Sequence, residues 1–133
     1  KILVLDDEFL RTKPFHDLGI AHHWVKHSWD AMKYIFEERP GCIFLDHDLR
    51  DELDIDSGMR VVEFLQAMLQ RDQSYRPIVV LHSLVEDFTV RHMRGGLTAW
   101  IDPLIKPFYK ISEPETLRVF LNYLEELYGV KFL

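Results

Sequence analysis

Acidic side chains follow two short apolar runs of this sequence, each at the point where a buried strand would end. Asp6 and Asp7 come directly after residues 2–5, and Asp46 comes directly after residues 42–45. Three carboxylates that lie close together repel one another unless a cation neutralises them. A hard divalent ion, Mg²⁺ or Mn²⁺, suits such a group because it binds a few carboxylates and keeps coordination positions for water and phosphate oxygens. The acids therefore predict a metal site that could also hold a phosphate.

Basic and hydroxyl side chains stand at comparable places elsewhere in the chain. They are His47 next to the third acid, His82 and Ser83 after residues 78–81, and Lys106 after residues 97–105. An ammonium group would supply a positive charge for a bound anion, and an imidazole or a hydroxyl could contact its remaining oxygens. Each residue alone is commonly a turn residue, but their order along the chain is a more specific signal.

The apolar runs predict the strands that position these side chains. Runs of four apolar residues are too short for buried helices and are typical of strands covered on both faces. The five expected strands are residues 2–5, 20–27 at the sheet edge, 42–45, 78–81 and 97–105, the last with a bulge or a late start at Asp102-Pro103. Helical spacing of apolar residues predicts a short or broken helix in residues 9–19, a short helix at about 86–93, and longer helices at 28–39, from 58 and at 112–128.

Alternating strands and helices predict one three-layer α/β domain over residues 1–133, with a mainly parallel sheet between two helical layers. Right-handed crossovers bring the carboxyl ends of such strands to the same edge of the sheet. Ligands of open α/β sheets bind at that edge. The acids, histidines, serine and lysine are therefore expected to meet there.

Two helix starts are predicted from capping residues. Ser28 can cap a helix whose apolar stripe is formed by Trp29, Met32, Ile35 and Phe36. Ser112 and Glu115 have the spacing of a capping box before the last helix. These side chains are expected to accept hydrogen bonds from the first N–H groups of their helices.

Composition narrows the class of protein. The hydrophobic fraction of 47% with 6 Gly and 6 Pro is typical of a compact globular chain. A formal charge of −6 without a basic cluster argues against nucleic-acid binding, and no apolar run approaches the ~20 residues of a membrane span. The one cysteine, Cys42, lies in an apolar run, which fits a reducing compartment. We expect a cytoplasmic protein that binds neither nucleic acid nor membrane.

Three of the seven histidines, His22, His23 and His27, cluster on the predicted edge strand. Adjacent side chains of a strand point to opposite faces, so His22 and His23 could not both ligate one metal. We expect exposed polar histidines there.

The order of these motifs resembles the receiver domains of bacterial response regulators. The matching pieces span nearly the whole chain: Ile-Leu-Val-Leu-Asp-Asp-Glu (2 to 8), Ile-Phe-Leu-Asp (43 to 46), Gly58 at the start of the next helix, Pro-Ile-Val-Val-Leu (77 to 81) and Ile-Lys-Pro-Phe (105 to 108). The resemblance implies a doubly wound, flavodoxin-like sheet of five parallel strands in the order 2-1-3-4-5.

The resemblance also implies roles for the site residues. Asp6 and Asp7 would be the acidic metal pair, and Asp46 would ligate the metal and accept a phosphoryl group. The backbone carbonyl of Asp48 would complete the metal site, and Lys106 would contact the phosphoryl group.

Departures from the usual receiver pattern cluster near the same site. His82 stands where receivers usually have Thr or Ser, with Ser83 one position later. The Leu-Asp-His-Asp-Leu string (45 to 49), the acidic loop after it and the His-Ser pair resemble a divergent branch of the superfamily, one proposed to process cyclic phosphates.

Three functions remain open at this point. The first is a stand-alone signalling receiver of a phosphorelay, in which Asp46 takes a phosphoryl group from a donor in the presence of Mg²⁺ and a protein partner reads the change. The second is a metal-dependent phosphoesterase for cyclic phosphates, with His82 or His47 as general acid or base. The third is an interaction module with an idle pocket. Because all the acids and the lysine are present, we prefer the first and favour the third least.

Overall fold

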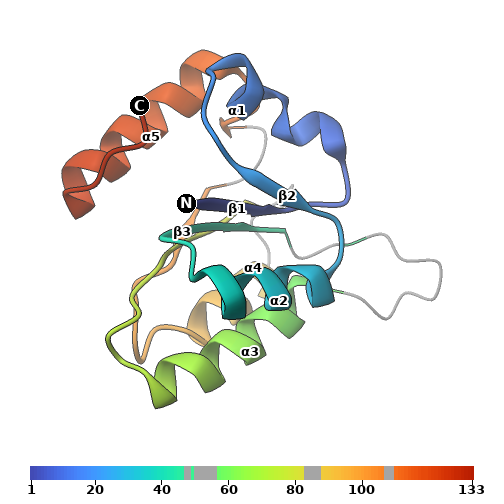
Figure 1. Ribbon diagram of the computed structural model, residues 1–133, viewed down its shortest axis with the longest axis vertical. Helices are drawn as coiled ribbons and strands as arrows, with labels where there is room; N and C mark the ends of the chain where they lie inside the picture. Colours follow the sequence, from blue (N-terminus) through green and yellow to red (C-terminus); the bar gives the residue numbers. More distant parts are fainter. Residues whose placement is uncertain (47–48, 50–56, 83–87, 107–109) are drawn as a thin grey trace.

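A five-stranded sheet forms the centre of the protein, with all neighbouring strands parallel and in the order β2-β1-β3-β4-β5 (Figure 1). The computed structural model describes residues 1–46, 49, 57–82, 88–106 and 110–133. The strands are β1 (Ile2–Leu5), β2 (His23–Val25), β3 (Cys42–Leu45), β4 (Ile78–Leu81) and β5 (Leu104–Ile105). The predicted fold class, strand order and edge position of β2 are confirmed.

Helices cover both faces of this sheet. Figure 1 shows α1 and α5 on one face and α2, α3 and α4 on the other. Their bounds are α1 (Lys13–Asp17), α2 (Ser28–Glu38), α3 (Gly58–Arg71), α4 (Phe88–Gly95) and α5 (Pro114–Tyr128), and one turn of 3-10 helix, η1 (Phe9–Thr12), precedes α1. No helix in the described ranges is long and apolar enough to cross a membrane.

Successive residues of the inner strands pack into different cores because the side-chain period of a strand is two. The core under α2, α3 and α4 contains Leu3, Leu5, Ile43, Leu45, Val79 and Leu81. The core under α1 and α5 contains Ile2, Val4, Cys42, Phe44, Ile78 and Val80. Every position of β1, β3 and β4 is buried, which is why these strands are uninterrupted apolar runs.

The capping predictions are wrong at both helices. His27 is the N-cap of α2 and Ser28 is its first residue, while Glu113 is the N-cap of α5; neither N-cap side chain makes a capping hydrogen bond. At α5 the start is shifted because Pro114, whose φ is already helical and which has no N–H to satisfy, suits the first turn.

The predicted apolar stripe of α2 is also wrong in part. Ile35 is buried and Met32 packs against the core as expected, but Trp29 and Phe36 are 48% and 66% exposed, and Ala31, which was not part of the predicted stripe, is buried.

The last strand begins late. The Asp102-Pro103 pair had predicted either a bulge or a late start in this strand. The N–H groups of Trp100 and Ile101 both donate to the carbonyl of Leu97, at 3.1 Å, so this segment is a turn and not a strand. Leu97 itself is buried in the core under α4. The ladder with β4 therefore starts only after Pro103.

Candidate functional site

Asp6, Asp46 and His82 are the first residues beyond β1, β3 and β4. Their backbone N–H groups extend the sheet: that of Asp46 donates to Leu5 O at 3.0 Å, and that of His82 donates to Leu45 O at 2.9 Å. Strand alternation places all three on the face covered by α1 and α5, in line with the apolar row beneath them. One row of the sheet thus changes from apolar to titratable at its carboxyl edge.

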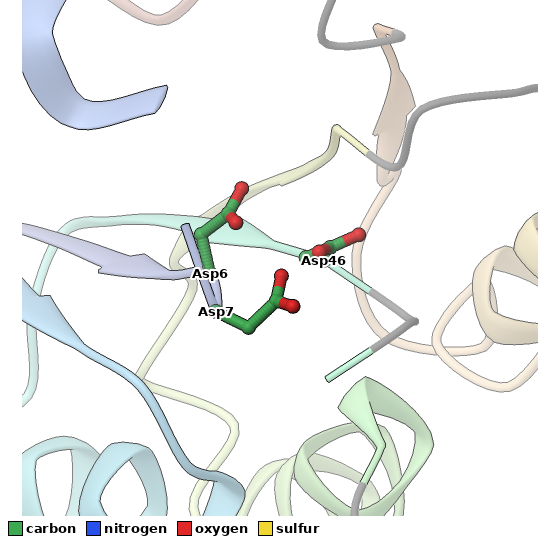
Figure 2. Close-up of side chains that lie close together, drawn as sticks. All are labelled: Asp6, Asp7 and Asp46. Carbon is green, nitrogen blue, oxygen red and sulfur yellow. The ribbon is translucent and has the colours of Figure 1, made fainter. Parts of the chain in front are cut away.

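The structure brings the carboxylates of Asp6, Asp7 and Asp46 together at this edge (Figure 2). One oxygen from each lies within 4.8 Å of the others, and Asp6 and Asp46 are buried. Ligands of one Mg²⁺ lie about 3 to 4 Å apart, since each is about 2.1 Å from the ion. The donor set and its spacing fit a hard divalent cation after a small contraction.

A cation that the sequence did not reveal lies among these acids. Arg11 Nη1 is 3.3 Å from Asp6 Oδ1, 3.3 Å from Asp46 Oδ2 and 3.9 Å from Asp7 Oδ1, and only 14% of the Arg11 side chain is exposed. It comes from η1, whose single turn begins two residues after the acidic pair. Asp7 and Arg11 are four residues apart, but Asp7 precedes η1, so the helical spacing rule did not apply and the sequence carried no clear signal for this contact.

His82 contacts the same cluster through Asp6. Its Nε2 lies 2.8 Å from Asp6 Oδ2, although β3 runs between the two strands concerned. The ring is 3% exposed, and its Nδ1 has no hydrogen-bond partner within the described part of the chain. One ring nitrogen is therefore held by a carboxylate while the other is available for a further partner.

The pKa of Asp6 is lowered even though burial by itself would raise it. The hydrogen bond with His82 Nε2 and the charge of that ring oppose the effect of burial, and the backbone N–H of Glu8 donates to Asp6 Oδ1 at 2.9 Å. Arg11 adds a smaller contribution of the same sign. Asp6 is therefore ionised at neutral pH despite its burial.

Backbone contacts fix the positions of two of the acids. Trp24 Nε1 donates to the carbonyl oxygen of Asp6 at 2.9 Å. Gly58, the first residue of α3, approaches the Asp46 carbonyl so closely that an added Cβ would lie 2.0 Å from that oxygen. The start of α3 and the end of β3 thus meet in a contact that only glycine allows.

The Lys106 ammonium forms no ion pair within 4.0 Å with a carboxylate in the part of the chain that the structure describes. Its backbone N–H donates to Leu81 O at 2.9 Å, in the ladder between β5 and β4. Its Nζ lies 5.2 Å from the centroid of the Phe120 ring on α5. The predicted contact of Lys106 with a phosphoryl group stays a prediction.

Three other predicted site residues, His47, Asp48 and Ser83, lie outside the described residues. Their expected roles stay predictions.

The clustered histidines have separate neighbours. His22 Nδ1 lies 2.9 Å from the carbonyl oxygen of Ile20. The rings of His23 and His27 stack on Tyr34 and Trp29, with centroids 4.2 and 4.3 Å apart. In the part of the chain that the structure describes, the group of residues with metal-ligand spacing is the acidic one.

The fold is shared with solved receiver domains. The chemotaxis protein CheY4 of Vibrio cholerae is 20% identical, with a TM-score of 0.63 over 92% of this chain and 95% of that one. A CheY-like receiver domain protein of Methanospirillum hungatei is 17% identical, with a TM-score of 0.60 over 94% and 92%. The BeF3-activated receiver domain of Klebsiella pneumoniae RstA is 16% identical, with a TM-score of 0.59 over 92% and 95%. At these identities the likeness establishes the fold.

The sequence itself identifies the family. No curated protein sequence matches the chain. A family model described as the cyclic-phosphate processing receiver domain matches residues 1–98, about three quarters of the chain. The strand order 2-1-3-4-5 agrees with that assignment, and an acidic cluster lies at the carboxyl edge of the sheet. The chain belongs to the cyclic-phosphate processing receiver domain family.

Proposed function

We propose that the protein is a receiver-type signalling domain whose acidic site binds Mg²⁺ or Mn²⁺ and accepts a phosphoryl group on Asp46. The observation that carries this proposal is the convergence of three carboxylates within 4.8 Å at the carboxyl edge of a receiver fold. A divalent cation bound there would neutralise charge on the carboxylates and on the incoming phosphate.

In the phosphoryl-transfer step, an oxygen of Asp46 forms a bond to phosphorus as the bond between phosphorus and the donor's oxygen breaks. With an acyl phosphate donor the products are the aspartyl phosphate and the donor's free carboxylate. Asp6, Asp7 and Asp46 would hold the cation, and the Lys106 ammonium would contact the phosphoryl oxygens. A protein partner would then read the changed surface.

A second candidate function is hydrolysis of a cyclic phosphate at the same site. The observation that favours it is the Asp6–His82 pair, in which one ring nitrogen is held at 2.8 Å and the other is unpartnered among the described residues. In this reaction water attacks phosphorus and releases one proton to solvent, one ring P–O bond breaks, and the departing oxygen takes one proton from a general acid, which solvent then reprotonates. A protonated His82 would donate that proton from Nδ1 while Asp6 holds Nε2.

Phosphorylation of Asp46 is tested by incubating the protein with Mg²⁺ and acetyl phosphate and following its intact mass. We expect the mass of one added phosphoryl group on the wild type and none on Asp46→Asn. Removing the cation with a chelator should also prevent the addition. An identical adduct on Asp46→Asn would contradict the proposed acceptor.

The two candidate functions are separated by His82→Thr, which restores the hydroxyl group usual for receivers. If the protein is a receiver, the adduct forms on this variant and 2′,3′-cyclic nucleotides are not consumed by either protein. If it is a phosphoesterase, the wild type opens the cyclic nucleotide and the variant loses about 10² to 10⁴ in rate. His16→Thr, at an exposed histidine of α1, is the matched control and should behave as the wild type.

A further inference from the structure

We propose that Arg11 has two alternative roles at the acidic site. Without metal it is the counter-ion of the three carboxylates, and a divalent cation displaces it. The displaced guanidinium then becomes a ligand of the bound phosphoryl group. This inference rests on the metal and phosphate site put forward above, and it adds a residue to which the sequence motifs assign no role.

The position of the guanidinium indicates competition with a metal ion. A single atom, Nη1, lies within 3.3 to 3.9 Å of an oxygen from each of Asp6, Asp7 and Asp46. One oxygen of each of these three carboxylates also lies within 4.8 Å of an oxygen of the other two, so a cation bound by all three would occupy nearly the same space. The guanidinium and a divalent ion cannot both take that position, for reasons of volume and of charge repulsion.

Burial makes the counter-ion necessary in the metal-free protein. The side chains of Asp6, Asp7 and Asp46 are 0%, 5% and 2% exposed, so solvent screens their mutual repulsion poorly. Arg11 supplies one positive charge to three carboxylates, whereas Mg²⁺ or Mn²⁺ supplies two. The stronger neutralisation favours exchange once the ion is available.

The local structure of η1 allows the guanidinium to leave. Buried Thr12 anchors the turn, and its Oγ1 donates to the carbonyl of Phe9 at 2.6 Å. Phe9 and Leu10 are 61% and 71% exposed, and the Phe9 ring contacts the Trp24 ring edge-on with centroids 5.2 Å apart, so the outer side of the turn faces solvent while the turn stays attached to β2. The proposed exchange requires a change of rotamer at Arg11, with the backbone of η1 staying in place.

The chemistry of arginine supports the second role. A guanidinium presents N–H donors in a planar fork that matches two phosphate oxygens, which an ammonium group cannot do. After displacement Arg11 stays tethered beside the acids, whereas Lys106 lies over the Phe120 ring. Among the described residues, Arg11 is thus a cationic side chain that already lies at the acidic site when an anion binds.

The test compares two affinities of the full chain, each measured by titration calorimetry. The first is for Mn²⁺ alone, and the second is for beryllofluoride in the presence of saturating Mn²⁺. For Arg11→Gln we expect Mn²⁺ to bind about tenfold more tightly and beryllofluoride about tenfold more weakly. A residue with only a structural role would weaken both ligands together.

Two further variants complete the test. Arg11→Lys keeps the positive charge but loses the planar pair of N–H donors. This variant should therefore compete with Mn²⁺ as the wild type does, but bind beryllofluoride more weakly. It also replaces Arg11→Gln in the test if that variant fails to fold. Arg39→Gln removes the same charge from an exposed arginine that pairs with Asp72, and it should change neither affinity.

The outcomes separate this inference from the proposed function. Equal Mn²⁺ affinity in wild type and Arg11→Gln, or changes of both affinities in the same direction, would overturn the role of Arg11 and leave the metal site standing. If neither protein bound Mn²⁺, the proposed metal site would be wrong, and this inference would fall with it.

Discussion

Replacing Gly58 by alanine should both destabilise the protein and distort its acidic site. The added Cβ would lie 2.0 Å from the Asp46 carbonyl oxygen and 3.0 Å from its carbonyl carbon. Both atoms belong to the backbone at the end of β3, which is buried between β1 and β4. A flexible side chain could rotate away from such a contact, but this segment of the sheet cannot.

The magnitude follows from the overlap. Carbon and oxygen atoms normally approach no closer than about 3.2 Å, so the start of α3 must move by about 1 Å or the end of β3 must. Overpacking of this kind costs about 1 to 3 kcal/mol, and a rigid backbone partner places Gly58→Ala near the upper value. For a chain of 133 residues a loss of about 3 kcal/mol corresponds to a fall in Tm of about 10 °C.

The assay is thermal unfolding followed by circular dichroism, with Gly41→Ala as the control. Nothing lies within 4 Å of a Cβ added at Gly41, so this variant should melt within about 2 °C of the wild type. Mn²⁺ affinity should fall in Gly58→Ala, because displacement of the Asp46 backbone moves its carboxylate away from the other acids. If Gly58→Ala melted like Gly41→Ala and bound Mn²⁺ like the wild type, the reasoning from close backbone approach would be refuted.

Other predictions follow from backbone geometry, electrostatics and burial. Arg39 ends α2 with φ of +45°, so Arg39→Gly should be about 1 kcal/mol more stable than Arg39→Ala in urea denaturation, and the opposite order would contradict the left-handed conformation. The backbone N–H groups of Phe132 and Leu133 donate to Glu125 Oε2 and lower the pKa of that carboxyl group. The ionised form therefore stabilises the fold above the usual carboxyl pKa of 4.5, and this contribution is lost as the pH falls through the lower pKa of the folded state. The Tm of Glu125→Gln should accordingly lie below that of the wild type at pH 7, with the difference closing in acid; a constant difference would argue against this linkage. Burial raises the pKa of the Cys42 thiol to about 12, so a thiol reagent at pH 8 should label it only after unfolding, and rapid labelling of the native protein would show that the thiol is accessible.

The sequence by itself determined the sheet and the location of the site. A parallel strand buried on both faces must be apolar at every position and must end where polar groups begin, so β1, β3 and β4 could be read from four-residue runs. The same rule placed Asp6 and Asp46 at one edge, because right-handed crossovers align the carboxyl ends of the strands. Both results depend on local pattern and on general rules of chain topology.

Contacts between side chains were decided only by the tertiary structure. Arg11 lies among three carboxylates because η1 folds back over the edge of the sheet, and His82 reaches Asp6 across the end of β3. The Lys106 ammonium lies over an aromatic ring of α5 instead of beside the acids. Each of these contacts depends on strand register and on the rotamer of a long or planar side chain. That rotamer is selected by neighbouring residues that are distant in the sequence. Residue type and spacing therefore predicted where the chemistry lies, while the pairing of charges within the site required the folded arrangement.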